Sequence, residues 1–366
     1  MSSAPKLSTP VRLGAIELKN RVVMAPLTRM RAVEGDVSSP LAKTYYAQRA
    51  GAGLIISEAT QISPIAKGYP ATPGIYSAEQ TQAWKEIVDA VHAKGGKIVA
   101  QLWHVGRISH SSLHPEQGLP EAPSAIAPAG KTLTATWQME AYETPKAMTA
   151  QDIERLKNDY KVAAHNAKTA GFDGVEIHAA NGYLLDQFLQ DKTNHRTDNY
   201  GGSIENRIRL LSEVLESVAT EFSYDRIGVR LSPYGSFNDM GDSDTAALFN
   251  AVIQKLNGYG LSYLHMIEPR STSAGGNDKV DENAPDTAQL FRKAFKGGFI
   301  SAGGYTSESG EQALVNDSAD AIAYGRLYIS NPDLAERFAN NAPLNPYDRG
   351  TFYGGAEKGY TDYPSL

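Results

Sequence analysis

Residues 299–326, FISAGGYTSESGEQALVNDSADAIAYGR, contain the pattern that decides the fold. Two short apolar runs, 299–302 and 321–324, flank a segment, 307–316, with a helical pattern. The runs lack regular alternation of polar and apolar residues, which is typical of strands buried on both faces of a parallel sheet. The stretch therefore predicts a strand, a helix and a second strand parallel to the first.

The same strand–helix unit recurs along the rest of the chain. Short apolar runs predict eight strands, at residues 22–25, 54–57, 97–102, 174–177, 227–231, 263–266, 299–302 and 321–324. Helical patterns lie between most of them, at residues 39–50, 79–94, 149–170, 204–222, 244–257, 287–294, 307–316 and 333–340. Eight strands alternating with helices favour a (β/α)8 TIM barrel of the α/β class. The alternative is a doubly wound open sheet. It is disfavoured because Gly51-Ala-Gly53 precedes a strand and lacks the third glycine of a dinucleotide-binding loop.

One connection is too long for a simple loop. Residues 103–148 contain five prolines, which exclude a single helix. We expect an excursion or small β-lid there, over the barrel mouth between the third and fourth strands. A second loop, 270–285, is polar and contains glycine, and we expect it to be mobile and to gate the site. No linker interrupts the pattern, so residues 1–366 are predicted to form one domain.

Composition narrows the class of protein. The 366 residues include no cysteine, which excludes disulfides, thiolate metal sites and a cysteine nucleophile. The net charge of −6 argues against nucleic acid as a partner. No stretch approaches the roughly 18 apolar residues of a membrane span, and residues 1–10 lack the apolar run of a signal peptide. We therefore expect a cytoplasmic protein.

In a TIM barrel the active site is built at the carboxyl ends of the strands. Polar residues and glycines follow all the predicted strands, and they include Glu58, His104 and Glu268. Gly303 and Gly304 follow the seventh strand, and Gly325 and Arg326 follow the eighth. Glycine lets backbone N–H groups approach an anion, and arginine can bind phosphate through two hydrogen bonds. These two turns predict a phosphate site.

Three further positions indicate what the phosphate carries. Gln101 and Arg230 lie on the third and fifth strands, and Thr28 follows the first. A buried cation, an amide and a hydroxyl can together face a flat, electron-poor ring. Such groups are the means by which a protein tunes a flavin.

His178, Asn181 and Tyr183 form a second candidate cluster. The first two lie three residues apart at the expected start of a helix, so they should face the same way. Both can donate hydrogen bonds to one substrate oxygen, and the Tyr183 phenol can give up a proton. The alternative is a core histidine followed by a capping asparagine. A metal site on His104 and His178 is disfavoured because no third ligand is apparent, and we expect no metal.

Five segments of the chain carry recognisable motifs: VEIHAANGYLLDQFLQ at 175–190, TDNYGGSIENR at 197–207, NRVVMAPLTR at 20–29, QLWHVGR at 101–107 and TFYGG at 351–355. Together they resemble the Old Yellow Enzyme family, in its bacterial ene-reductase branch. The resemblance implies a barrel that binds FMN without a covalent bond. It also implies a ping-pong cycle, in which NADPH or NADH reduces the flavin and flavin N5 then passes hydride to the C=C bond of an α,β-unsaturated carbonyl. Nitro compounds are further expected substrates.

The resemblance also implies a role for individual residues. The implied cofactor contacts are Pro26, Thr28, Ala59, Gln101 and Arg230 at the ring, and Gly303, Gly304, Gly325 and Arg326 at the phosphate. The implied catalytic residues are His178 and Asn181, which grip the substrate oxygen, and Tyr183, which donates the proton. The implied substrate-pocket aromatics are Tyr69, Trp103 and Tyr353.

One alternative function is a flavin-free TIM-barrel lyase acting on a phosphorylated substrate. It explains Arg326 and the glycines but not Gln101, Arg230 and Thr28 together. The expected partners are therefore small molecules, NAD(P)H and activated alkenes, with no nucleic acid and no membrane. The chain is expected to be a monomer or a homodimer.

Overall fold

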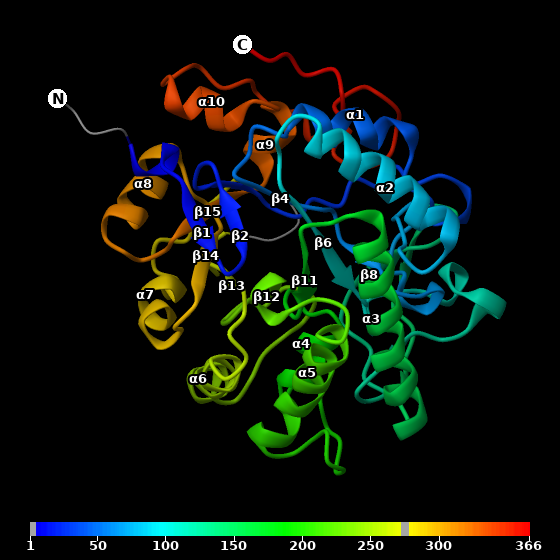
Figure 1. The fold of residues 1–366 in the computed structure, drawn as a ribbon. Helices are drawn as coiled ribbons and strands as arrows, with labels where there is room; N and C mark the ends of the chain where they lie inside the picture. Colours follow the sequence, from blue (N-terminus) through cyan, green and yellow to red (C-terminus); the bar gives the residue numbers. More distant parts are fainter. Residues whose placement is uncertain (1–4, 272–277) are drawn as a thin grey trace.

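The computed structural model describes residues 5–271 and 278–366. Within them, eight parallel strands surround the centre of the molecule (Figure 1). They are β3 (Val22–Met24), β4 (Leu54–Ile56), β6 (Ile98–Trp103), β11 (Gly174–His178), β12 (Ile227–Leu231), β13 (Tyr263–Ile267), β14 (Gly298–Ala302) and β15 (Ala321–Tyr324). Each strand pairs with the next in this order, and the last strand, β15, pairs with the first, β3, which closes the barrel. The predicted (β/α)8 fold is confirmed.

Helices form the outer layer of the barrel (Figure 1). They are α1 (Pro40–Gln48), α2 (Ala78–His92), α3 (Ala150–Ala170), α5 (Ile204–Val218), α6 (Thr245–Leu256), α7 (Thr287–Phe291), α8 (Ser307–Val315) and α10 (Leu334–Ala339). In α3, Thr149 and Asp152 form the reciprocal capping box that their spacing predicts. The helix ends at Ala170, and Gly171 caps it with a φ of 90° in the left-handed conformation.

The predicted helix boundaries differ from the observed ones where apolar residues continue past a turn. The helix expected at 204–222 ends at Val218, because Ala219 caps it and the buried Phe222 lies beyond the cap. One helix was missed, α9 (Arg326–Ser330), and α4 (Leu184–Leu189) begins after the helix start that was expected at residues 178–181. Both are too short to show a helical period.

An N-terminal hairpin, β1 (Val11–Leu13) and β2 (Ile16–Leu18), was also missed. Its apolar side chains are buried in one cluster with residues from inside the barrel. Ser262 donates a hydrogen bond to the Leu13 carbonyl at 2.9 Å, which ties the hairpin to the start of β13. Gly14 is required in its turn, because φ is +57° and a Cβ atom would lie 2.2 Å from the Asp225 carbonyl oxygen. The hairpin therefore closes the amino-terminal end of the barrel.

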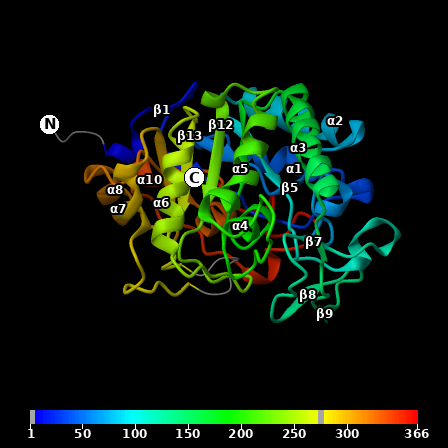
Figure 2. The same cartoon turned by 90° about the horizontal axis from the view of Figure 1, so that it is seen from below.

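The excursion at 103–148 carries strands of its own. β8 (Lys131–Leu133) and β9 (Met139–Ala141) form an antiparallel hairpin, and β7 (Glu121–Ala122) pairs with β10 (Lys146–Ala147). Figure 2 shows this hairpin on the opposite side of the molecule from β1. It projects at the carboxyl end of the strands, which confirms the expected excursion. We call the hairpin the lid, and its role as a cover of the barrel mouth stays a prediction. Across residues 5–271 and 278–366, no helix is long and apolar enough to cross a membrane.

Candidate active site

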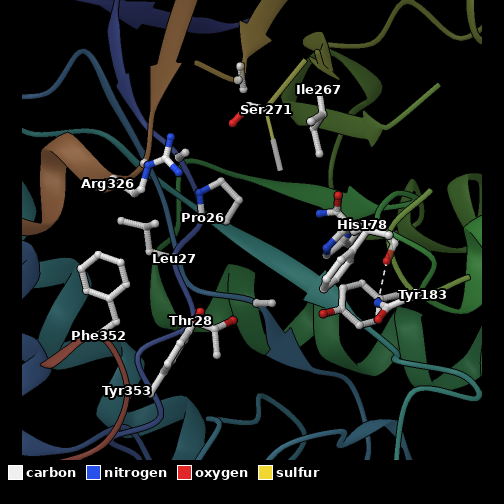
Figure 3. A pocket seen from close by; sticks show the side chains of 18 of the residues that line it. Pro26, Leu27, Thr28, His178, Tyr183, Ile267, Ser271, Arg326, Phe352 and Tyr353 are labelled. Carbon is white, nitrogen blue, oxygen red and sulfur yellow. Dashed lines mark hydrogen bonds between the residues drawn. The ribbon is translucent and has the colours of Figure 1, made fainter. Parts of the chain in front are cut away.

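A cavity of about 870 Å³ opens at the carboxyl ends of the strands. All residues that the sequence singled out for cofactor, substrate or catalysis line it, and they are Pro26, Thr28, Ala59, Tyr69, Gln101, Trp103, His178, Asn181, Tyr183, Arg230, Gly303, Gly304, Gly325, Arg326 and Tyr353. Figure 3 shows His178 and Tyr183 on one side of the cavity, Phe352 and Tyr353 on the other, and Thr28 between them. Tertiary folding thus brings together residues, such as Pro26 and Tyr353, that lie more than three hundred positions apart in the chain.

Gln101, His178 and Arg230, which lie on the barrel strands, form what we call the floor. Arg230 pairs in register with His178 of β11, so the cation and the imidazole are neighbours. The Nε atom of Arg230 is buried and has no hydrogen-bond partner within the described chain. Burial lowers the pKa of Arg230, and the nearby Glu176 carboxylate opposes that effect. The floor therefore offers a buried donor that a ligand can use.

His178 is the last residue of β11, and Asn181 lies in the turn before α4. The expectation that both sit at a helix start was wrong. Both line the cavity, and Asn181 adopts a φ of +57°, a conformation that asparagine tolerates better than most residues. The Asn181 N–H donates to Ser232 Oγ at 2.7 Å, and its carbonyl accepts from Asn238 Nδ2 at 2.8 Å. These two side chains hold the turn in place.

His178 is 3% exposed, and its Nδ1 atom has no hydrogen-bond partner among the described residues. Burial, and next the charge of Arg230, lower the pKa of His178 well below its ordinary value. The imidazole is therefore neutral near pH 7, with one N–H to donate. Burial raises the pKa of Tyr183, so its phenol keeps its proton near neutral pH. The two rings meet edge to face, with centroids 5.1 Å apart.

Aromatic rings form one wall of the cavity. Tyr69 stacks on Trp103 with ring centroids 5.9 Å apart, and Trp103 meets Tyr183 edge to face at 5.1 Å. The hydroxyl groups of Tyr69 and Tyr183 are 3.2 Å apart. This wall holds the Tyr183 phenol in a fixed position within the cavity.

Residues of the lid and the C-terminal tail surround the opening. We call Lys131, Leu133, Met139, Trp137 and Tyr353 the rim. All except Trp137 line the cavity, and the Trp137 ring lies next to Gly354, where an added Cβ would be 3.2 Å from it. Tyr353 is 45% exposed and Met139 is 55% exposed, so the rim is open to solvent.

The glycine turns after β14 and β15 form the corner of the cavity where the sequence predicts a phosphate site. Gly303 and Gly304 have φ of +116° and +68°, and a Cβ on Gly303 would lie 2.9 Å from the Glu268 carbonyl oxygen. Arg326 Nε lies 3.3 Å from an Asp278 carboxylate oxygen, and Arg349 approaches the same oxygen at 2.5 Å. Arg326 therefore pairs with a negative group that lines the same cavity.

Three of the polar residues that follow predicted strands, Glu58, Glu268 and His104, do not line the cavity. Glu268 instead accepts the Thr287 and Ala288 N–H groups at 2.8 and 2.9 Å, and so caps α7. His104 accepts the Gly106 N–H at 3.0 Å, and burial lowers its pKa to about 3. No group of three or more His, Asp or Glu side chains that could hold a metal occurs in the described part of the chain.

Ser232 and Asn238 were missed by the sequence analysis, although Ser232 directly follows the fifth strand and could have been found there. Of the loop at 270–285, Ser271, Asp278 and Val280 line the cavity, while residues 272–277 lie outside the described residues. Its gating role stays a prediction.

Comparison with known proteins agrees with this geometry. A model of the NADH:flavin oxidoreductase / NADH oxidase family matches residues 6–345. The chain is 47% identical to 12-oxophytodienoate reductase 2 of Arabidopsis thaliana, over 98% of this chain and 96% of the relative. It is 48% identical to 12-oxophytodienoate reductase 1 of Oryza sativa subsp. japonica, over 100% and 94%.

Solved structures of related proteins are similar to this chain over nearly its whole length. Morphinone reductase in complex with tetrahydroNAD superposes with a TM-score of 0.92 at 46% identity, over 99% of this chain and 98% of that one. The Old Yellow Enzyme homologue of Zymomonas mobilis superposes with a TM-score of 0.93 at 45% identity, over 99% and 100%. The chain belongs to the NADH:flavin oxidoreductase / NADH oxidase family. It is an FMN-dependent enzyme of the Old Yellow Enzyme type, with a nicotinamide nucleotide as reductant. The flavin-free lyase alternative finds no support.

Proposed function

We propose that this enzyme reduces the C=C bond of α,β-unsaturated carbonyl compounds, and also acts on nitro compounds. One observation carries the proposal. A neutral, buried His178 and the fixed Asn181 turn line one cavity together with a protonated Tyr183 phenol. Hydrogen-bond donors beside a proton source suit a substrate that gains negative charge on oxygen and then a proton on carbon. Cytoplasmic location and a monomeric or homodimeric state remain predictions.

The residues present fit FMN. Arg230 Nε and Trp103 Nε1 are buried without partners among the described residues. The Gly303 turn leaves no room for a side chain, and Arg326 pairs with the Asp278 carboxylate, so its guanidinium can pair with a negative group. Gln101, Arg230, Thr28, Pro26 and Ala59 would hold the ring, and Gly303, Gly304, Gly325 and Arg326 would hold the phosphate. When bound, FMN supplies a two-electron carrier that accepts hydride from NAD(P)H and delivers it to the alkene.

The side chains around that group perform the remaining tasks. His178 and Asn181 donate hydrogen bonds to the substrate oxygen and stabilise it as negative charge develops. Tyr183 holds a proton that it can deliver to the α-carbon, because its raised pKa keeps the phenol protonated. Tyr69, Trp103 and Tyr353 provide aromatic surface that orients the substrate.

An absorbance experiment tests the function. Purified protein should show a flavin band near ~450 nm that bleaches with NADPH under nitrogen and returns when cyclohexenone is added. His178→Ala should retain the flavin and its reduction, while enone turnover falls about 10²- to 10³-fold. His104→Asn is the matched control, because His104 is equally buried but does not line the cavity. A protein that stays colourless after reconstitution with FMN would overturn the proposal.

A further inference from the structure

We propose that Glu176 is a positioning residue for bound FMN, because it sets the orientation of the Gln101 amide and balances the charge of Arg230. This inference rests on the cofactor roles proposed for Gln101 and Arg230. Glu176 lies on β11 with 0% of its surface exposed. Gln101 and Arg230 line the cavity, whereas Glu176 is not among the described residues that do. It is therefore a buried carboxylate behind the floor.

Hydrogen bonds engage both oxygens of this carboxylate. Gln101 Nε2 donates to Glu176 Oε1 at 2.7 Å, and His265 Nδ1 lies 2.9 Å from Oε2. Burial alone would raise the pKa of Glu176, but His265, Arg230 and the Gln101 hydrogen bond overcome it and lower the pKa. Glu176 is therefore ionised near pH 7 and can only accept hydrogen bonds.

An acceptor behind Gln101 decides which way the Gln101 amide faces. Because Glu176 can only accept, Gln101 must present its amide nitrogen to it, and the amide oxygen is directed elsewhere. The side chain lines the cavity, so its oxygen is the acceptor offered to a ligand. The pyrimidine edge of FMN carries an N–H group between two carbonyls, and that N–H group matches such an acceptor.

The same carboxylate controls the charge at the floor. Burial lowers the pKa of His265, and Glu176 only partly opposes this effect. With His178 also neutral, Glu176 and Arg230 are the charged groups of this cluster. The negative charge of Glu176 offsets the positive charge of Arg230. Removing it would strengthen the attraction of Arg230 for an anionic ring, and reduced FMN is more anionic than oxidised FMN.

Glu176→Gln tests both proposed roles of Glu176, the orientation of the Gln101 amide and the balance of the Arg230 charge. The substitution keeps the size of the side chain and removes its charge. The ratio of the affinities for reduced and oxidised FMN should rise about tenfold, which is about +30 mV for a two-electron couple. Oxidised FMN should bind less tightly, because Gln101 can then face either way. Glu58→Gln is the matched control, since Glu58 is 4% exposed and does not line the described cavity. A reduction potential equal to that of wild type would overturn the proposal.

Glu176→Asp separates the two effects, because it keeps the charge but withdraws it from Gln101. It should weaken binding of oxidised FMN and leave the potential unchanged. If neither variant folds, the wild-type protein still tests the amide orientation with FMN methylated at the ring N–H. That analogue should bind about tenfold more weakly than FMN, and Gln101→Ala should remove most of the difference. Equal binding of the two flavins by wild type would overturn the proposal.

These outcomes differ from a failure of the proposed function. If wild-type protein binds no FMN, the cofactor roles themselves are wrong. If wild type binds FMN and reduces enones while Glu176→Gln changes neither affinity nor potential, the role of Glu176 alone is wrong.

Discussion

The floor and the rim of the cavity are built in opposite ways. Floor residues lie on paired strands, and Gln101 and His178 are 1% and 3% exposed. Rim residues lie on the β8–β9 hairpin and the C-terminal tail, and Met139 and Tyr353 are about half exposed. Precise chemistry needs groups that cannot move, whereas a pocket for varied substrates tolerates mobile walls. The difference implies that substitutions at the floor change the chemistry and that those at the rim change substrate preference.

Beyond the substitutions of His178 and Glu176 described above, the largest effect on activity is expected next to the floor, at Tyr183. Tyr183→Phe removes the proton source but keeps the ring that packs on Trp103 and His178. Alkene reduction should slow by about 10- to 100-fold, while reduction of the flavin by NADPH keeps its rate. Stopped-flow measurement of the two half-reactions separates them, with Tyr69→Phe as the control for loss of the hydroxyl contact. Equal slowing of both half-reactions would contradict a proton-donor role.

A smaller effect is expected beneath the Asn181 turn, at Asp186. Asp186 is 1% exposed and accepts the Gly182 N–H at 2.8 Å. Burial raises its pKa to about 6, against partial opposition from the Gln190 hydrogen bond. Because the pKa in the folded state exceeds the value of about 3.9 in the unfolded chain, the stability from this group is full below about pH 4. It is lost as the pH rises through about 6.

Asp186→Asn should abolish this dependence. Relative to wild type, the variant should gain stability on the order of 1–3 kcal/mol as the pH rises from about 4 to about 7. Urea unfolding at several pH values measures the difference. Asp152→Asn is the opposite control: hydrogen bonds from Thr149 lower the Asp152 pKa in spite of partial burial. Its stability contribution is lost as the pH falls. If the stability of the two variants changed with pH in the same direction relative to wild type, the raised pKa assigned to Asp186 would be wrong.

The smallest effect is expected at the rim. Trp137→Ala removes an exposed ring that lies against Gly354 and should loosen the contact between the lid and the tail. KM for bulky enones should change a few-fold, while unfolding stability shifts by no more than about 0.5 kcal/mol. The flavin reduction potential should not change. Leu290→Ala, at an equally exposed position on α7, is the control, and steady-state kinetics with small and large enones gives the comparison. A changed potential would place the rim in contact with the chemistry.

The barrel could be predicted because each of its strands is a short apolar run that can be recognised from its own residues. A run such as 321–324 is buried on both faces, so apolar composition alone identifies it. The β1–β2 hairpin could not be predicted from apolar runs, because an exposed charged residue interrupts each of its three-residue strands, and its apolar residues pack on distant partners inside the barrel. The short helix α9 was missed because five residues complete barely more than one turn.

The candidate site likewise contains residues that the sequence could predict and residues that it could not. Position at a strand end identified Gln101, Arg230 and His178, because parallel strands bring their carboxyl ends to one mouth. That rule also selected Glu268 and His104, which hydrogen-bond to nearby backbone and face away from the cavity. A strand end places a residue near the mouth, but neighbouring side chains decide where it points.

The sequence by itself determined the order of strands and helices, the family and the types of residue available to the site. Those features depend on local burial and on motifs that are continuous in the chain. The tertiary structure alone decided that Asn181 reaches the cavity through a left-handed turn, held by Ser232 and Asn238. It also decided that Glu176 lies behind Gln101 and near Arg230. Contacts between separate strands set these positions, and only closure of the barrel brings such strands together.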